Sequence, residues 1–352
     1  MTAEAPTAGP AVSVVMAAYN GAAFIRETID SLFAQTMPDF EIVVADDCST
    51  DDTLAVLAAM NDPRLRVVKA ERNGGPAAAR TLAMSQARGR FIAGLDQDDI
   101  CAPDRFEKQL AYLDAHPDVV LVCSTIAMFE GGKLRRDPYP DLTDPDEIDW
   151  MMGLLNPLAW STAMIRGEAA RRLEPFERDE YRFAEDFDLY TRIRAHGRIG
   201  RIAEPLVRYR LHPGGASQAY EQGMIRAAGR VLADRHATLF GVEAAEAGEM
   251  LSRYAGASYP PPDAATLARC GAIMARFLED MRSNPFAQDS SRMIWWRIAR
   301  SGLRMGHYNA AEMMRVRPAF AGSGAALRPA LLRDAAIGAT RRARRLAASL
   351  SL

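Results

Sequence analysis

The sequence predicts an α/β fold with a mostly parallel sheet and a C-terminal helical appendage. Between residues 12 and 123, apolar runs rich in β-branched residues alternate with segments whose apolar residues recur at helical spacing. This alternation is typical of right-handed βαβ units. From about residue 235 the strand-like runs fade, and Ala, Met, Arg and Leu recur at helical spacing. We therefore expect a flexible N-terminus (1–11), an α/β domain (12–234) and a helical C-terminal region (235–352).

Five segments are predicted to be strands. The first, 12–19 (VSVVMAAY), is almost continuously apolar, as expected for a strand that is buried on both faces. The second, 41–47 (EIVVADD), is also apolar but ends in two carboxylates. The other predicted strands are 65–69, 91–95 and 119–123.

Helices are predicted between these strands. The first, which reaches about residue 35, places Ile25, Ile29 and Leu32 on one stripe, and Asn20 is its predicted N-cap. Three further helices are expected: one that contains residues 54–60, one between residues 73 and 89, and one over 103–116 that starts at its proline.

Composition limits the classes of function. The 352 residues are 49% hydrophobic and 25% charged, which is ordinary for a globular protein. The net charge of −2 gives no overall attraction to nucleic acid. The four cysteines are widely spaced and lack zinc-site spacing, which favours reduced thiols. We find no secretory signal and no apolar stretch of bilayer length, so we expect a cytoplasmic protein.

Two acidic clusters follow predicted strands. Asp46 and Asp47 end the second strand, and Asp96, Asp98 and Asp99 follow the fourth. Because parallel sheets bind ligands beyond the carboxyl ends of their strands, we expect both clusters on one edge of the sheet. The DXD spacing of Asp96 and Asp98 suits a divalent cation, since carboxylates bind Mg²⁺ or Mn²⁺ together with substrate phosphates. A solvated turn is the alternative interpretation.

Three further segments carry polar residues without a decisive motif. The GGP stretch at 74–76 lacks the glycine spacing of dinucleotide-binding and Walker loops, so a flexible entry to a helix is the simpler interpretation. Glu185 and Asp186 open a predicted helix, where acids also complement the helix dipole. Arg210 and His212, in YRLHPGG, fit either a functional loop or an ordinary exposed one.

Taken together, the motifs resemble the inverting glycosyltransferases of family 2, which have the Rossmann-like GT-A fold of nucleotide-diphospho-sugar transferases. The resemblance covers about residues 12–217. Several motifs in one order are more specific than any single motif. They are VSVVMAAYNGAAFIRETIDSLFAQTMPDFEIVVADDCSTDDT, NGGPAAARTLA, GRFIAGLDQDDICAPDR, WSTAMIRGEAARRLEPF, AEDFDLYTRI and LVRYRLHPGGAS.

The resemblance implies roles for individual residues. It makes Asp186 the catalytic base, with Glu185 as its neighbour. It makes Asp98 a metal ligand, and it makes His212 a metal ligand or a contact to phosphate. Contacts to the nucleotide are implied for Tyr19, Asp46, Asp47, Arg80, Asp96 and Gln97.

Other positions have a supporting or altered role in the resemblance. Ala17 and Ala18 stand where family members often have Pro-Thr, so no side-chain contact to the nucleotide is carried over to these two positions. Asp99 adjoins the DXD motif, while Arg192 and Arg210 are expected to be structural or directed at the diphosphate.

The implied reaction moves a sugar from a nucleoside-diphosphate sugar, with UDP or dTDP favoured, to an acceptor hydroxyl in cell-surface polysaccharide or glycoconjugate synthesis. Mn²⁺ or Mg²⁺ would neutralise the leaving diphosphate. One carboxylate base suffices for a single inverting displacement, and no GxSxG or Cys–His pattern offers a covalent nucleophile. We expect residues 130–160 and the helical region to recognise the acceptor, which is a saccharide or a lipid-linked molecule.

Three other classes fit less well. A haloacid-dehalogenase-type phosphatase would carry its DxD after the first strand, and a nucleotidyltransferase would begin with a Gly-rich basic loop. An inactive nucleotide-sugar-binding module would have no use for the base, the DXD motif and the YRxH segment together.

The chain ends in a basic segment, 331–350. Its arginines alternate with Leu and Ile at helical spacing, which predicts either peripheral contact with the inner face of the plasma membrane or a solvated helix packed on the appendage. The arginines are Arg341, Arg342, Arg344 and Arg345.

Overall fold

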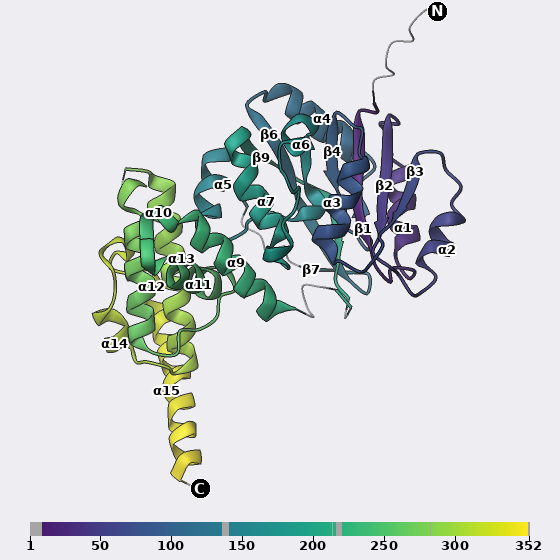
Figure 1. Ribbon diagram of the computed structural model, residues 1–352. Coiled ribbons are helices and arrows are strands. Elements are labelled where there is room, and N and C mark those ends of the chain that lie inside the picture. The colour runs from purple at the N-terminus through teal and green to yellow at the C-terminus, as the bar shows by residue number, and fades with distance from the viewer. Residues whose placement is uncertain (1–8, 136–140, 213, 216–219, 282, 351–352) are drawn as a thin grey trace, which may run out of the picture. The chain divides into compact units, whose positions relative to one another are not determined.

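The computed structural model describes residues 9–135, 141–212, 214–215, 220–281 and 283–350 (Figure 1). The chain forms two compact units. Residues 1–149 and 157–227 make the α/β unit, and residues 150–156 and 228–352 make the helical unit. Most of the N-terminus that we expect to be flexible, residues 1–8, lies outside the described residues.

One sheet organises the α/β unit. Its order is β3-β2-β1-β4-β8-β6-β9-β5, with β7 paired to β6. The first four strands of the chain are parallel, β8 is antiparallel to both of its neighbours, and β6 and β9 are again parallel. The predicted α/β fold with a mostly parallel sheet is therefore confirmed. The strands are β1 (Val12–Ala18), β2 (Phe40–Asp46), β3 (Leu65–Lys69), β4 (Phe91–Gly94), β5 (Ile100–Cys101), β6 (Val119–Glu130), β7 (Lys133–Arg135), β8 (Met164–Arg166) and β9 (Arg198–Arg210).

Helices connect the parallel strands, and helices alone build the C-terminal part from residue 221 onwards within the described residues (Figure 1). The earlier helices are α1 (Ile25–Phe33), α2 (Thr53–Ala58), α3 (Pro76–Gln86), α4 (Arg105–Ala115), α5 (Pro145–Met152), α6 (Gly167–Arg171) and α7 (Glu185–Ile193). The later ones are α9 (Glu221–Arg235), α10 (Ala237–Phe240), α11 (Ala244–Met250), a π-helical turn (Leu251–Gly256), α12 (Ala264–Phe277), α13 (Pro285–Met305), α14 (Ala310–Arg315) and α15 (Arg328–Leu350).

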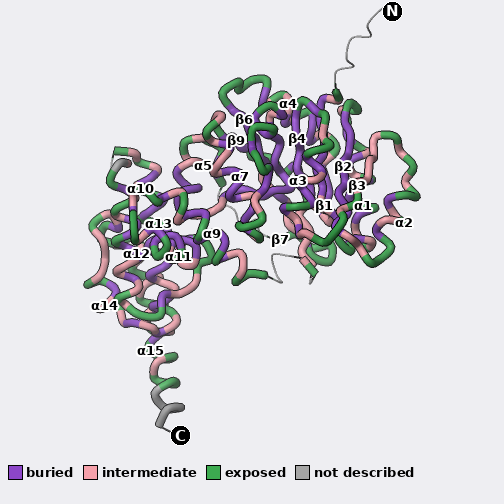
Figure 2. Tube along the Cα trace, in the orientation of Figure 1, coloured by how far each residue is buried: buried purple, intermediate pink, exposed green. Residues whose placement is uncertain are grey.

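The central strands form the core of the α/β unit (Figure 2). All of β2 and β4 is buried, and in β1 only Ala17 is partly exposed. Burying one large aliphatic side chain stabilises the fold by about 1.5–3 kcal/mol. Because these strands are covered on both faces, their sequences are continuous apolar runs rather than alternating ones.

Two predicted helix starts are wrong. α1 begins at Ile25, because Asn20 adopts a left-handed backbone conformation (φ 48°) and stands in the loop before it. The Asn20 side chain instead accepts a hydrogen bond of 2.8 Å from the backbone N–H of Thr50. α4 begins at Arg105 rather than at Pro103. The start of α1 is therefore set by a tertiary contact of Asn20, and the start of α4 follows a turn that contains Pro103.

A helix that spans a membrane must be both long and apolar. No helix within the described residues combines the length and the hydropathy that crossing a bilayer requires.

Candidate active site

The two acidic clusters lie at one edge of the sheet. In the parallel pair β1–β2, Ala18 lies beside Asp46 at the strand ends, and β4 pairs with the other side of β1. The residues that follow β1, β2 and β4 therefore emerge side by side, as expected from the sequence. The two clusters nevertheless have different surroundings.

The first cluster is held by backbone amides. One carboxylate oxygen of Asp47 accepts a hydrogen bond from the N–H of Gly74 and the other from the N–H of Gly75, each at 2.8 Å. Asn73 donates to the carbonyl of Asp47 at 2.9 Å. Gly75 has a φ of 84°, which a side chain would strain. Asp47 thus anchors the loop that precedes α3.

Asp46, its neighbour, is buried, but within the described part of the chain only one of its two carboxylate oxygens accepts a hydrogen bond. Its Oδ2 accepts a bond of 3.2 Å from the N–H of Ser49, whereas its Oδ1 has no hydrogen-bond partner among the described residues. A buried polar oxygen without a partner costs about 1–3 kcal/mol.

A cavity of about 650 Å³ opens next to Asp47. It lies between the end of β3 and the start of α3, and three basic side chains that the sequence did not single out line it together with Asn73. No motif marks these residues, because they come from two distant segments, the end of β3 with its following loop and the loop before α7. The basic residues are Lys69, Arg72 and Arg182.

Tyr19 and Gln97 fix each other at the ends of β1 and β4. The amide of Gln97 accepts a 3.0 Å hydrogen bond from the N–H of Tyr19 and donates one of 3.0 Å to its carbonyl. The side chain of Tyr19 stays 48% exposed. Gln97, which the resemblance assigns to the nucleotide, therefore uses its amide to position the residue after β1. Ala17 lies within β1 and is partly exposed.

The second cluster is held by His212, by the guanidinium of Arg210 and by the backbone at the end of β9. Oδ2 of Asp98 lies 2.8 Å from Nε2 of His212. The carbonyl of Asp98 accepts a 2.8 Å bond from Nε of Arg210. Asp99 is buried, and its Oδ1 accepts a 2.9 Å bond from the N–H of Arg210. Arg210 also pairs with Glu27 at 2.6 Å, so it closes the loop in a structural role.

Burial disfavours the charged forms of these carboxyls. Desolvation raises the pKa of Asp98, and the nearby Asp96 raises it further, while His212 opposes this effect. Burial together with Asp98 and Asp96 raises the pKa of Asp99 well above its ordinary value. A bound cation would relieve this repulsion.

Four residues form the Arg80 cluster: Arg80, Asp96, Glu177 and Glu185. The guanidinium is buried and lies 3.0 Å from Glu177, 3.2 Å from Asp96 and 3.6 Å from Glu185. That Arg80 faces the nucleotide or its diphosphate stays a prediction, and in the structure its guanidinium lies among these carboxylates. Burial raises the pKa of Glu177 to about 8, and Glu185 adds to this rise against the opposing effect of Arg80. The cluster joins the DXD motif to the start of α7.

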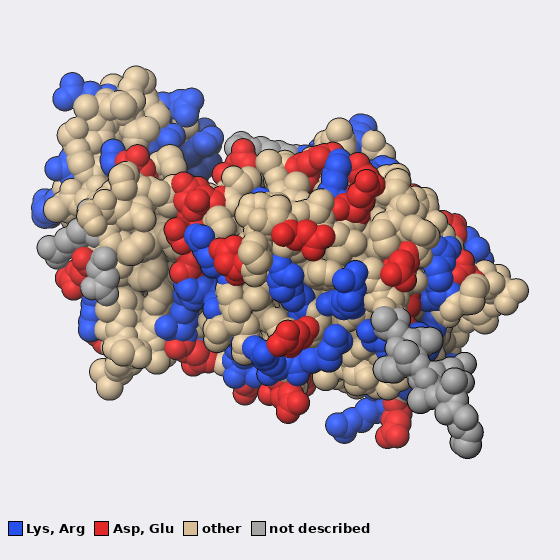
Figure 3. All heavy atoms as spheres, turned by 90° about the horizontal axis from the view of Figure 1, so that it is seen from above, with Lys and Arg blue, Asp and Glu red and all other residues tan. Residues whose placement is uncertain are grey.

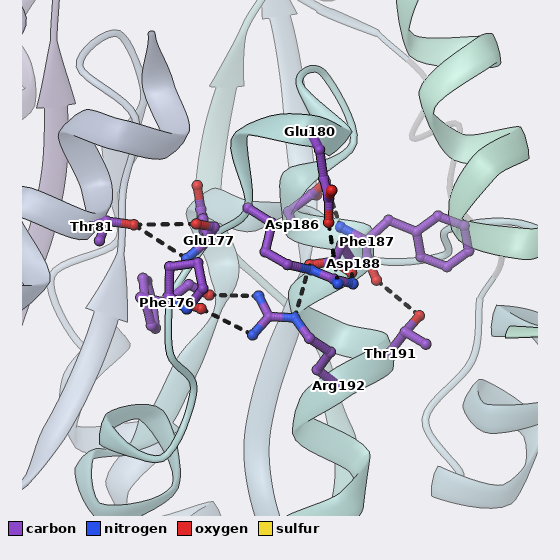
Figure 4. A network of polar contacts seen from close by, with 11 residues as sticks. Thr81, Phe176, Glu177, Glu180, Asp186, Phe187, Asp188, Thr191 and Arg192 are labelled. Atoms are coloured by element: carbon purple, nitrogen blue, oxygen red, sulfur yellow. Dashed lines mark hydrogen bonds and ion pairs between the residues drawn. The ribbon is translucent and has the colours of Figure 1, made fainter. Parts of the chain in front are cut away.

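Asp186 is the second residue of α7 and is partly exposed. Its Oδ1 accepts a 2.7 Å hydrogen bond from the N–H of Phe187. Figure 4 draws Asp186 within a polar network, beside Glu177 and Asp188.

Arg192 stabilises that network from the next turn of α7. It pairs with Asp188 at 2.8 Å and donates to the carbonyl of Phe176 at 2.7 Å (Figure 4). It also donates to the carbonyl of Pro175 at 3.1 Å. It therefore holds the loop that carries Glu177 against α7. Sequence reasoning missed Glu177, which stands in a loop with no recognisable spacing.

Asp98 and His212 are the side chains that could hold a cation. No group of three or more His, Cys, Asp or Glu residues in the described part of the chain could hold a metal ion. A cation at Asp98 and His212 would therefore need ligand oxygens to complete its coordination. This donor set fits Mg²⁺ or Mn²⁺, which typically take one or two protein carboxylates and complete their shell with phosphate oxygens. Pro213, the first residue of the glycine-containing loop after His212, lies outside the described residues.

Comparison with known proteins gives consistent matches. A family model described as "Glycosyl transferase family 2" matches residues 13–173. The succinoglycan biosynthesis protein ExoO of Rhizobium meliloti is 42% identical over 149 residues, which make up 40% of this chain and 42% of ExoO. An uncharacterized glycosyltransferase of Methanocaldococcus jannaschii is 31% identical over 208 residues, or 57% of this chain and 71% of that protein. The matched segment thus spans less than half the length of ExoO.

A solved structure shares the fold. Residues 1–349 of S. aureus TarS, in complex with UDP, match with a TM-score of 0.54 and 20% identity over 83% of this chain and 90% of that one. At this level of identity the likeness concerns the fold.

Proposed function

Because the chain belongs to glycosyltransferase family 2, we propose that it transfers a sugar from a nucleoside-diphosphate sugar to an acceptor hydroxyl, with inversion at the anomeric carbon. One observation carries the proposal: the Arg80 cluster links Asp96 of the DXD motif to Glu185, the neighbour of Asp186. The candidate cation site and the candidate base thus adjoin one charged network. The family that the motifs predicted is confirmed, and the reaction details are the proposal.

We assign the nucleotide to the edge of the sheet between Tyr19 and the cavity beside Asp47. Tyr19 exposes an aromatic face on which a base can stack. Asp47 still has acceptor capacity beyond its two amide bonds, because a carboxylate offers about four lone-pair positions. Lys69, Arg72 and Arg182 add donors for carbonyl or phosphate oxygens. UDP is the first nucleotide to test, since TarS, of similar fold, was solved with UDP.

Asp98 and His212 would hold the divalent cation. When bound, the cation supplies positive charge to the leaving diphosphate as a Lewis acid. Imidazole is a softer ligand than carboxylate, so the presence of His212 favours Mn²⁺ over Mg²⁺. The chain's own part is to present Asp98, whose backbone Arg210 fixes through the 2.8 Å bond to its carbonyl.

Asp186 is proposed as the general base. Glu185 is buried and turned to Arg80, whereas Asp186 is partly exposed at the first turn of α7. A sugar hydroxyl is a weak nucleophile, so a carboxylate must take its proton during attack on the anomeric carbon. General base catalysis of this kind contributes about 10²- to 10⁴-fold. One displacement opposite the leaving diphosphate inverts the configuration.

The acceptor is proposed to be a growing saccharide of a surface polysaccharide. The name of ExoO, a succinoglycan biosynthesis protein, supports this class. The segment 130–160, which we expect to contact the acceptor, includes residues 136–140, outside the described part.

The release of nucleoside diphosphate from UDP-, GDP- and dTDP-sugars in Mn²⁺ tests the proposal. Without an acceptor, the wild-type protein should slowly hydrolyse one of these three donors and release its nucleoside diphosphate. Asp186→Asn should lower this rate by about 10²- to 10⁴-fold while keeping the thermal shift that donor binding causes. Asp114→Asn removes an exposed carboxylate and serves as the matched control.

The alternative, an inactive binding module, predicts a thermal shift without any release from the wild-type protein. If Asp186→Asn keeps more than about a few per cent of the wild-type rate, the base is misassigned.

A further inference from the structure

A groove of about 910 Å³ lies within the helical unit, bounded by α13, the loop 321–327 and α15. It combines an apolar floor with an arginine-rich rim, and we call it the arginine groove. We propose that it binds an anionic lipid of a membrane surface, with the lipid phosphate on the arginines and an acyl chain on the floor. The residues that carry the argument are Trp296, Met305 and Leu327 in the floor and Arg297, Arg304 and Arg341 on the rim.

The floor is preformed around Trp296. This side chain is buried, and its Nε1 donates a 2.8 Å hydrogen bond to the carbonyl of Ala321. Gly324 has a φ of 65°, and a Cβ at this position would lie 2.4 Å from the indole ring. The loop therefore lies against Trp296 because residue 324 is glycine. Met293 also lines the groove and is 67% exposed, so the apolar surface reaches solvent.

The rim carries more positive charge than the protein neutralises. Arg297, Arg300 and Arg304 recur at spacings of three and four residues, which places them on one face of α13. Arg300 pairs with Asp334 at 2.8 Å. Within the described residues, Arg297, Arg304 and Arg341 have no ion pair with a carboxylate.

The guanidinium groups of Arg297 and Arg341 are positioned by backbone carbonyls and, for Arg341, by a thioether sulfur. Arg297 donates to the carbonyl of Ala255, and Arg341 donates to the carbonyl of Arg304 at 3.2 Å and to the sulfur of Met305 at 2.8 Å. Each guanidinium has five N–H donors, so donors remain for the oxygens of a phosphate.

Both halves of the groove point to an amphiphile. A soluble phosphate would use the rim and leave the floor in water, whereas an anionic lipid matches the charge and covers the apolar surface. The face of the molecule in Figure 3 differs from the groove, because acidic and basic side chains are intermixed over it. Such a mixed surface creates no strong field of one sign.

The groove extends the hypothesis that the sequence raised for residues 331–350. Arg342, Arg344 and Arg345 continue along α15 beyond Arg341. A basic residue near an anionic membrane strengthens binding by about five-fold. α13 and the loop 321–327 would add a site for one lipid to this general attraction. This inference stands independently of the proposed transfer.

Vesicle flotation of the full chain tests the inference. The probes are vesicles of phosphatidylcholine alone and vesicles with about one third phosphatidylglycerol. The wild-type protein should float with the anionic vesicles only. The triple variant Arg297→Gln, Arg304→Gln, Arg341→Gln should bind them at least about 10-fold more weakly. Its matched control is Arg26→Gln, Arg90→Gln, Arg315→Gln, three exposed arginines outside the groove, which should bind as the wild type does.

Two further arms separate a lipid from a free anion and from unspecific charge. Leu327→Ser keeps every charge but should weaken binding by about two- to five-fold, because it removes apolar floor. Equal losses in both triple variants, or flotation with phosphatidylcholine alone, would overturn the proposal. Displacement by inorganic phosphate at constant ionic strength would also overturn it, because the groove would then be a site for free phosphate. Thermal unfolding confirms that each variant is folded.

Discussion

The two acidic clusters at the edge of the sheet look alike in sequence and differ in their surroundings. Asp47 accepts hydrogen bonds from the backbone amides of Gly74 and Gly75, and within the described part of the chain no cationic side chain is bonded to it. Asp96 and Asp98 instead face Arg80 and His212. The first cluster therefore shapes a loop, and the second concentrates charge. The place of an acidic residue at the end of a parallel strand therefore does not determine its role. The role depends on the groups that its carboxylate contacts.

The largest effect that the comparison predicts follows from the removal of the Arg80 cation. At about pH 9, above the pKa of Glu177, Arg80→Met should lower the free energy of unfolding by about 3–5 kcal/mol, because Glu177 and Glu185 remain buried without their counter-charge. Urea unfolding followed by circular dichroism measures this. Arg88→Met, which removes an exposed partner of Glu41, should cost at most about 1 kcal/mol. A loss below about 1 kcal/mol for Arg80→Met would mean that the cluster holds no ionised carboxylates.

A smaller loss of unfolding free energy is expected when the first acidic cluster is changed. Asp47→Ala leaves the N–H groups of Gly74 and Gly75 without their acceptor, and it should cost about 2–4 kcal/mol. The same change should speed hydrogen exchange at these two amides. Asp46→Ala removes one weaker bond and one unpaired oxygen, so its cost should be smaller. Equal losses of unfolding free energy in Asp47→Ala and Asp46→Ala would show that Asp47 does not anchor the loop more strongly than Asp46 does.

The smallest effect concerns pH. The Glu177 carboxyl keeps its proton in the folded protein up to a pKa of about 8, against an ordinary value of 4.5. Between these values the folded state binds more protons than the unfolded state, so this group's contribution to stability falls as pH rises. Relative to Glu177→Gln, the wild-type unfolding free energy should fall by on the order of 1 kcal/mol between about pH 7 and 8.5. A constant difference would show that Glu177 is ionised throughout.

The sequence predicted the strands that are buried on both faces more reliably than it predicted short elements. β1, β2 and β4 are buried, largely apolar runs and were predicted, and β3 (LRVVK), which is partly exposed, was predicted as well. β5 and β7 have two and three residues, too few for any periodicity, and their existence depends on pairing with β9 and β6. A helix start such as that of α1 depends on a contact between Asn20 and Thr50 that a local pattern does not contain.

For the site, motifs at strand ends were visible and contacts between distant loops were not. The position of the DXD motif after a strand follows from the alternation of elements. Glu177 lies 97 residues from Arg80 in the chain, and its carboxylate acquires a role only when the fold brings the two together. The same holds for Arg182, which reaches the cavity beside Asp47 from a loop without a motif.

The central claim is that the second cluster holds a cation with the nucleotide diphosphate, whereas the first does not. Calorimetric titration of UDP in Mn²⁺ and in EDTA tests it with the wild-type protein, Asp98→Asn and Asp46→Asn. We expect Mn²⁺ to tighten UDP binding at least about 10-fold in the wild-type protein and in Asp46→Asn, but not in Asp98→Asn. If Asp98→Asn keeps the full effect of Mn²⁺, the cation is bound elsewhere and the account is wrong.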